Sequence, residues 1–276
     1  MPDALRRLLG TPQGQLGSLI VLVAVLLAVL GPILAPYDPE QFHITARFQG
    51  PSSRFWLGTD QFGRDLLSRI MMGARSTLPL ALLATVIGTG VGAVIGTLSA
   101  FLGGRADEAI MRTVDAVMAI PGLLFALLIV TALGANAFNA ILAIGIAFAP
   151  SMIRITRSVA LAVRSQDYVK AAIARGESGR FIVVREMLPN VIAPIVVETT
   201  IRVSFAVMTL ATLSFLGLGA QPPSSEWGLM VSEARSYLFR NPWMMVWPGL
   251  AIAMIAVGFN LLGDGLRDAL NPRTSE

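Results

Sequence analysis

The chain of 276 residues is 54% hydrophobic and only 14% charged, and its mean hydropathy is +0.69. Soluble domains carry about a quarter charged residues, so this composition indicates a membrane protein. The absence of cysteine excludes disulfides and thiolate chemistry, and the single histidine, His43, excludes a histidine-rich metal site. In a membrane protein the net charge of +4 is better explained by topology than by binding to nucleic acid.

Six apolar runs approach the length of about 20 residues that a helix needs to cross a bilayer. The first run is longer than the core of a signal peptide and lacks an Ala-x-Ala cleavage pattern, so we expect it to be retained. The runs are found at residues 18–36, 79–102, 114–133, 138–153, 192–217 and 244–263. The sequence therefore predicts an all-α membrane protein with six transmembrane helices, in which residues 1–17 precede one six-span domain, 18–276.

The distribution of basic residues predicts the orientation in the membrane. With six spans both termini lie on one side, which holds thirteen basic residues against seven on the other. The positive-inside rule then predicts cytoplasmic N- and C-termini, although the first external loop, 37–77, is also basic. The second long external segment, 218–243, is expected to contain a short helix along the outer surface and an interfacial anchor, Trp227.

One cytoplasmic stretch, VKAAIARGESGRFIVVREMLPN at 169–190, differs from the apolar runs around it. DYVKAAIAR predicts a short helix, because Ala171 and Ala172 are strong helix formers and no helix breaker interrupts it. Gly176 permits a turn, RFIVVREML predicts a second short helix, and Pro189 is expected to end that helix before the next span. Such a projection offers small alanines to another protein, but composition alone equally favours a solvated basic loop.

The spacing of this stretch resembles the "EAA" loop of ABC-importer permeases, which reads Glu-Ala-Ala, three residues, Gly and a closing Leu-Pro pair. In that family the loop is a coupling helix that sits in a cleft of the ATP-hydrolysing subunit. The resemblance therefore implies a cytoplasmic coupling loop at 154–190, with coupling residues Lys170, Ala171, Ala172, Gly176, Leu188 and Pro189. Lys170 stands where the family has Glu, but an exposed ion pair contributes only on the order of 0–1 kcal/mol, so we expect the coupling role to persist.

Three more segments resemble dipeptide and oligopeptide permeases, of which LSFLGLGAQPPSSEWG (213–228) is the most specific. The others are LGTDQFGRDLLSRIMMGAR (57–75) and NLLGDGLRDALNPR near the C-terminus. The subfamily commonly has Glu three residues before LSFLGLG, whereas this chain has Leu210, so a role for an acid there is not carried over. The resemblance implies a C-type permease subunit with the type I ABC importer (MetI-like) fold in a bacterial cytoplasmic membrane.

This resemblance also implies partners. A substrate-binding protein delivers peptide from outside, a second homologous permease subunit completes the path, and two cytoplasmic subunits bind ATP. The chain has no G-x-x-x-x-G-K-[ST] loop, so we expect a transport subunit without catalytic residues, metal or cofactor of its own. The alternatives are a permease for another cargo, such as a nickel chelate or small cationic solute, and an ion-coupled secondary transporter.

Charges inside the predicted spans are costly and point to function or to mutual neutralisation. Glu198 and Arg202 are four residues apart in the fifth span, so they either contact the charged ends of a peptide or form a structural pair. Asp115 is expected beside Arg112 at the membrane interface. In the first external loop, acidic and basic side chains either form local salt bridges or meet the binding protein; they are Asp60, Arg64 and Asp65.

A stripe of small residues lies in the second span. Gly88, Gly92 and Gly96 recur every four residues and share one helix face, where they allow another helix to approach closely. We expect a packing contact there rather than a direct role in the transport path.

Overall fold

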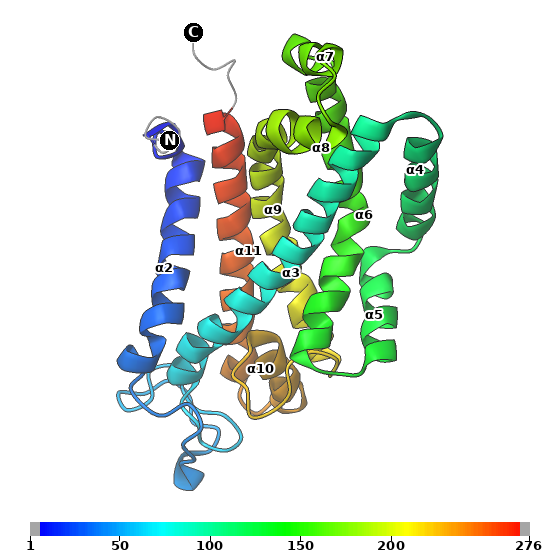
Figure 1. The fold of residues 1–276 in the computed structure, drawn as a ribbon. Helices are drawn as coiled ribbons and strands as arrows, with labels where there is room; N and C mark the ends of the chain where they lie inside the picture. The colour runs from blue at the N-terminus through cyan, green and yellow to red at the C-terminus, as the bar shows by residue number, and fades with distance from the viewer. Residues whose placement is uncertain (1–5, 271–276) are drawn as a thin grey trace.

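A computed structural model describes residues 6–270, and within that range it contains helices and no strand (Figure 1). Five helical segments are long and apolar enough to cross a membrane. They are α2 (Pro12–Leu34), α3 (Leu66–Leu102), α6 (Ala137–Arg164), α9 (Leu188–Phe215) with the short helices before it, and α11 (Trp243–Leu270). The prediction of an all-α membrane protein is thereby confirmed.

The third predicted span is not one straight helix. The chain forms α4 (Gly104–Met118) and α5 (Gly122–Leu133), which are bent by 87° and count as a sixth candidate span if the pair is taken as one. The continuous helix expected at 114–133 is therefore wrong. Pro121 explains the break, because proline lacks the N–H that a helix interior requires and its ring clashes with the preceding turn.

Two spans are longer than their apolar runs. α3 begins at Leu66, thirteen residues before the expected start of this span, and Asp65 caps it by accepting a hydrogen bond from the Ser68 N–H at 2.8 Å. α6 continues through Arg154 to Arg164, into the predicted loop 154–190. Hydropathy placed the start of α3 too late and the end of α6 too early, because it counts charged residues against a helix even where ion pairs neutralise them.

The glycine stripe of α3 packs against α6, as expected. A Cβ at Gly88 would lie 2.7 Å from the Gly145 carbonyl oxygen, and one at Gly96 would lie 2.6 Å from that of Ile153. A Cβ at Gly92 would collide with the Cβ of Met152. The two backbones therefore approach so closely that only glycine fits on this face of α3.

The two ends of the bundle differ (Figure 1). α2 begins and α11 ends at the same end of the bundle as α7 (Asp167–Ala174), and we call this the α7 end. Residues 35–65 and α10 (Trp227–Ala234) lie at the opposite end, the α10 end, with the short helices η1 (Ile44–Ala46) and η3 (Arg235–Tyr237). The arrangement matches an even number of crossings, while a cytoplasmic position for the α7 end stays a prediction from the positive-inside rule.

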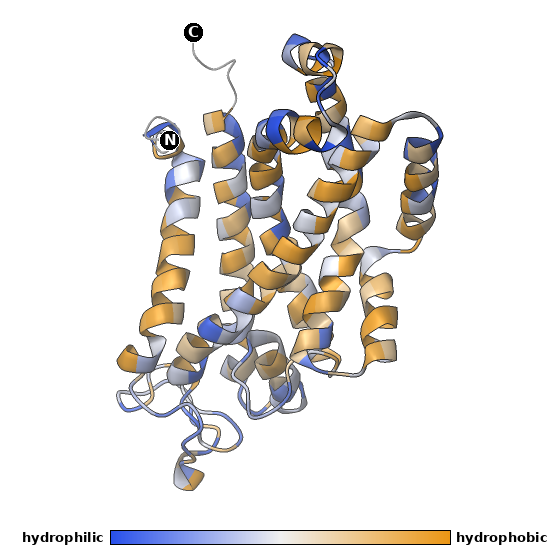
Figure 2. Ribbon diagram, in the orientation of Figure 1, coloured by the Kyte–Doolittle hydropathy of each residue, from blue (hydrophilic) through white to orange (hydrophobic). Residues whose placement is uncertain are grey.

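Hydropathy distinguishes the sides of the bundle. The middle of α2 is hydrophobic on all its turns, whereas α4 and α9 contain hydrophilic turns (Figure 2). Most of the large apolar side chains of α2 are exposed, including Leu19, Val29 and Ile33. We therefore expect α2 to face lipid and the hydrophilic turns of α4 and α9 to face a partner or an aqueous path.

Replacing Gly92 with leucine should destabilise the bundle by about 3 kcal/mol, because the side chain must displace the α6 backbone. Gly90→Leu is the matched control, since Gly90 lies on the same helix, is exposed, and has open space around an added Cβ. Thermal unfolding in detergent should show a clearly lower Tm for Gly92→Leu only. Equal Tm values for the two variants would contradict the packing role.

Candidate functional site

The helix α7 packs against a small hydrophobic cluster at the α7 end of the bundle, which we call its base. Val169 and Ala172 are fully buried against Ala100 of α3, Ala160 of α6 and Met187. The opposite face is open to another protein, and its exposed residues are Tyr168, Lys170, Ala171 and Ile173. The expectation that both alanines face outward is thus wrong for Ala172, which packs inward, and holds for Ala171.

The turn after α7 has the predicted glycine geometry. Gly176 has φ of +76°, in the left-handed region that favours glycine. Its N–H donates to the Ile173 carbonyl oxygen at 3.0 Å, and the Glu177 N–H donates to that of Ala172 at 3.2 Å. This pair of hydrogen bonds closes the helix in a Schellman motif, which fixes the direction of the chain after α7. Lys170 forms an exposed ion pair with Asp167, with 3.2 Å between Nζ and Oδ1.

Pro189 does not end a helix, contrary to expectation. The chain passes from α8 (Gly179–Phe181) through the π-helix η2 (Ile182–Met187) directly into α9. Leu188 and Pro189 are the first two residues of α9. The Leu188 N–H donates a π-helical hydrogen bond to the Val183 carbonyl oxygen across the junction between η2 and α9. The elements α8, η2 and α9 therefore form one continuous helix.

The pair Glu198–Arg202 stands in the middle of α9 and lines a cavity. Arg202 Nε donates to Glu198 Oε1 at 3.1 Å, and the two side chains are 19% and 20% exposed. The cavity has a volume of about 310 Å³ and lies between α5, α6 and α9. Its other lining residues are Gly122, Leu123, Ala147, Phe148, Phe205 and Thr209. The pair is therefore self-neutralised and also faces a space that a solute can enter, so the two interpretations of the pair are compatible.

Ion pairs between α4 and α6 could not be read from the sequence. Asp107 accepts hydrogen bonds from the Arg157 guanidinium and, at 2.5 Å, from the Ser99 hydroxyl. Asp115 pairs with Arg154 rather than with Arg112, so the expected neighbour was wrong.

Arg112 instead pairs with Glu108 at 2.6 Å. That contact has the i,i+4 spacing that sequence can suggest, whereas Asp115 and Arg154 are far apart in the chain.

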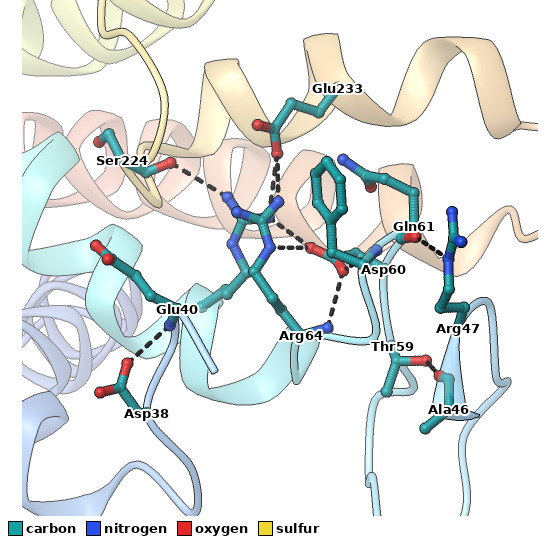
Figure 3. Close-up of polar contacts among 12 residues, drawn as sticks. Asp38, Glu40, Ala46, Arg47, Thr59, Asp60, Gln61, Arg64, Ser224 and Glu233 are labelled. Carbon is teal, nitrogen blue, oxygen red and sulfur yellow. Dashed lines mark hydrogen bonds and ion pairs between the residues drawn. The ribbon is translucent and has the colours of Figure 1, made fainter. Parts of the chain in front are cut away.

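A buried network of four charges holds the first long loop at the α10 end (Figure 3). Asp60 Oδ2 accepts from Arg64 Nε at 2.6 Å and from Arg69 Nη1 at 2.7 Å. Glu233 Oε2 accepts from both guanidiniums at 3.1 Å. The side chains of Asp60, Arg64 and Arg69 are at most 4% exposed, so the network consists of internal salt bridges that join the loop to α3 and α10.

Trp227 lies buried in the core at the α10 end and is not an interfacial anchor, contrary to expectation. It is 2% exposed, and its Nε1 donates to the Ile70 carbonyl oxygen at 3.0 Å. Glu226 precedes it and caps α10 by accepting from the N–H groups of Gly228 and Leu229. Burial raises the pKa of the Glu226 carboxyl, and these hydrogen bonds to the charged form oppose that shift.

These features define a multi-span membrane component with an exposed helix at one end and a charged cavity within the bundle. Residues 88–276 match the family described as "Binding-protein-dependent transport system inner membrane component". Residues 1–51 match the family described as "N-terminal TM domain of oligopeptide transport permease C". The chain belongs to the first of these families, and the resemblance to dipeptide and oligopeptide permeases of the C type is confirmed.

Curated relatives are similar over nearly their whole length. The "Probable D,D-dipeptide transport system permease protein DdpC" of Escherichia coli (strain K12) is 41% identical over 96% of this chain and 89% of that protein. The "Glutathione transport system permease protein GsiD" of Pectobacterium atrosepticum is 39% identical over 97% and 89%. The "Di/tripeptide transport system permease protein DppC" of Pseudomonas aeruginosa is 42% identical over 95% and 88%. The family is one of ABC transporter permeases, so the chain is a transport subunit rather than an enzyme.

Replacing Arg69 with methionine should lower the free energy of unfolding by about 3–5 kcal/mol, because Asp60 and Glu233 lose a buried cation. Arg112→Met is the control, since it removes a guanidinium whose side chain is 78% exposed and should cost at most about 1 kcal/mol. Chemical unfolding of both purified variants measures the difference. A cost for Arg69→Met no larger than that of the control would show that the network does not hold the loop.

Proposed function

We propose that the chain is a permease subunit of an ATP-driven importer for di- and oligopeptides, in which it forms half of the translocation path. A second, homologous permease subunit supplies the other half. The observation that carries the proposal is the charged pair at the middle of α9, which lines a cavity between three helices. Family membership supports transport, and the names of three relatives, which specify D,D-dipeptides, glutathione and di- or tripeptides, support a peptide cargo.

The cavity suits the chemistry of such a cargo. A short peptide at neutral pH carries a carboxylate and an ammonium group, and the cavity offers Arg202 and Glu198. Phe148, Phe205 and Leu123 provide apolar walls for a side chain. An ion-coupled transporter would instead need an acid that is free to bind a proton or cation, and Glu198 already accepts a hydrogen bond from Arg202.

The exposed face of α7 is proposed to dock on an ATP-binding subunit in the cytoplasm. Lys170, Ala171 and the turn at Gly176 would meet that partner, while Ala172 holds α7 to its base. Leu188 and Pro189 belong to the helix that runs on to Glu198 and Arg202, so they would transmit movement rather than touch the partner. ATP would bind and be hydrolysed on two such subunits.

The same proposal gives the placement of the complex. The chain would lie in the bacterial inner membrane with its termini in the cytoplasm, and an extracytoplasmic binding protein would deliver peptide to the α10 end. Transport of another cargo, such as a nickel chelate or a small cationic solute, is the alternative that the uptake experiment separates.

The chain should be required for ATP-dependent uptake of a labelled dipeptide. Uptake is measured in cells with and without the chain, each before and after ATP depletion with the proton gradient held. We expect uptake to need both the chain and ATP. Uptake that needs ATP but not the chain would point to another cargo, and uptake that needs the chain but persists without ATP would refute the importer mechanism.

Gly176→Pro should abolish uptake while the protein still reaches the membrane at a normal level. Proline cannot adopt the positive φ of this turn and also lacks the N–H that bonds to Ile173, so α7 would lose its orientation. Gly176→Ala is the graded control, because its Cβ meets no atom within 4 Å and only the backbone is strained, by roughly 1 kcal/mol. It should retain partial uptake. Full uptake by the proline variant would show that α7 does not couple to the ATPase.

A further inference from the structure

An apolar groove runs along the inner side of α2, between α2, α3 and α11. Its volume is about 290 Å³, and its lining residues on α2 run from Ile20 to Leu27, roughly 10 Å along the helix axis. Two other lining residues, Trp227 of α10 and Ile255 of α11, are only 2% and 3% exposed, so the groove reaches into the core. The groove is separate from the charged cavity, which lies between α5, α6 and α9.

Close helix contacts at glycines bound the groove at both of its ends. Towards the α7 end, a Cβ at Gly17 would collide with the backbone of Leu262, so α2 touches α11 there. Towards the α10 end, a Cβ at Gly31 would lie 3.0 Å from the Met71 carbonyl oxygen, so α2 touches α3. The helix α2 therefore crosses from one neighbour to the other, and the groove is the space beneath its middle.

The chemistry of the groove wall favours hydrocarbon. The lining side chains are aliphatic, apart from one methionine and two tryptophans. Trp227 Nε1 donates to the Ile70 carbonyl oxygen at 3.0 Å, and Trp247 Nε1 donates to that of Leu57 at 3.1 Å, so both indole N–H groups are already paired. An apolar cavity of this kind does not hold water, and a peptide would lose its hydration there without new hydrogen bonds.

The mouth of the groove opens at the depth of the lipid chains. Its exposed lining residues are Val23 of α2 and Leu250 and Met254 of α11. A helix of another protein would need small residues at this mouth for a close approach, and these side chains are branched or long. Trp243, the first residue of α11, is 39% exposed and stacks on Trp247, as suits the membrane–water interface. The groove begins one helical turn further along α11, where hydrocarbon surrounds the helix.

We propose that this groove binds one acyl chain of a bilayer phospholipid from the leaflet at the α10 end, with the headgroup near Trp243. An empty groove would leave its lining side chains without contacts on one side, and an acyl chain restores those contacts. The lipid would act as a structural ligand that fills the space beneath α2 and holds α2 to α3 and α11. The inference depends on the position of these helices in the membrane and is independent of the transported cargo.

Crosslinking of the wild-type protein tests the site directly. The chain is reconstituted in proteoliposomes, alone and in the complete transporter, with a phospholipid that carries a photoactivatable diazirine in the middle of one acyl chain. Mass spectrometry then locates the lipid adducts. We expect adducts on Trp227 and Ile255, because these buried residues meet lipid only through the groove.

Two variants on α11 separate the groove from the surrounding lipid. Ala251→Phe places a ring in the groove, because Ala251 is one of its lining residues. Val257→Phe is the matched control, since it adds a ring at an exposed position of the same helix outside the groove. Ala251→Phe should lower the share of adducts on Trp227 roughly tenfold, because excluding about two methylene groups costs that factor in affinity. Val257→Phe should leave this share unchanged.

Wild-type protein with adducts only on exposed residues of α2 and α11 would overturn the inference. Adducts on Trp227 in the isolated chain that disappear in the complete transporter would also overturn it, because a partner subunit would then occupy the groove. Equal shares of adducts on Trp227 in the two phenylalanine variants would contradict binding in the groove. If Ala251→Phe does not assemble, the smaller Ala251→Leu replaces it, with a loss of adducts in the same direction expected.

Discussion

The close contact between α3 and α6 positions both the base of α7 and one wall of the cavity. Glycine at three successive turns of α3 brings the two backbones together, and the far ends of both helices then supply Ala100 and Ala160 to the base of α7. The middle of α6 supplies Phe148 to the cavity. A wider separation of α3 and α6 would remove the packing surface beneath α7 and would also open the cavity wall. The contact between these two helices therefore links the exposed surface of α7 with the interior of the bundle.

Neutralisation of charge is the second constraint on the bundle. Water is scarce among the spans, so an unpaired charge there is costly, and the ion pairs described above neutralise charge within the chain. The pairs occur at three levels: the four-charge network at the α10 end, the Glu198–Arg202 pair within α9, and the pairs from α4 to α6 nearer the α7 end. The first level fixes a loop, whereas the pair within α9 lines a cavity.

Continuity of the helix after α7 gives the proposed coupling a physical route. Gly179 to Phe215 form one helical segment, in which the π-helical turn accommodates Pro189 without a break. Movement of α7 would act on this segment through the packing of Val169 and Ala172 against Met187. Because no flexible loop intervenes, a displacement at the α7 end would be carried to Glu198 and Arg202.

The sequence by itself determined what depends on near neighbours. Apolar runs predicted six spans, of which five are single long helices in the described residues; Gly176 predicted its turn, and i,i+4 spacing predicted the Glu198–Arg202 pair, because helical periodicity relates residues that are close in the chain. Only the tertiary structure decided the inward face of Ala172, the Arg69–Glu233 contact and the cavity. Those features arise where segments far apart in the chain come together, and no local pattern of residues specifies which distant backbone or charge will lie opposite.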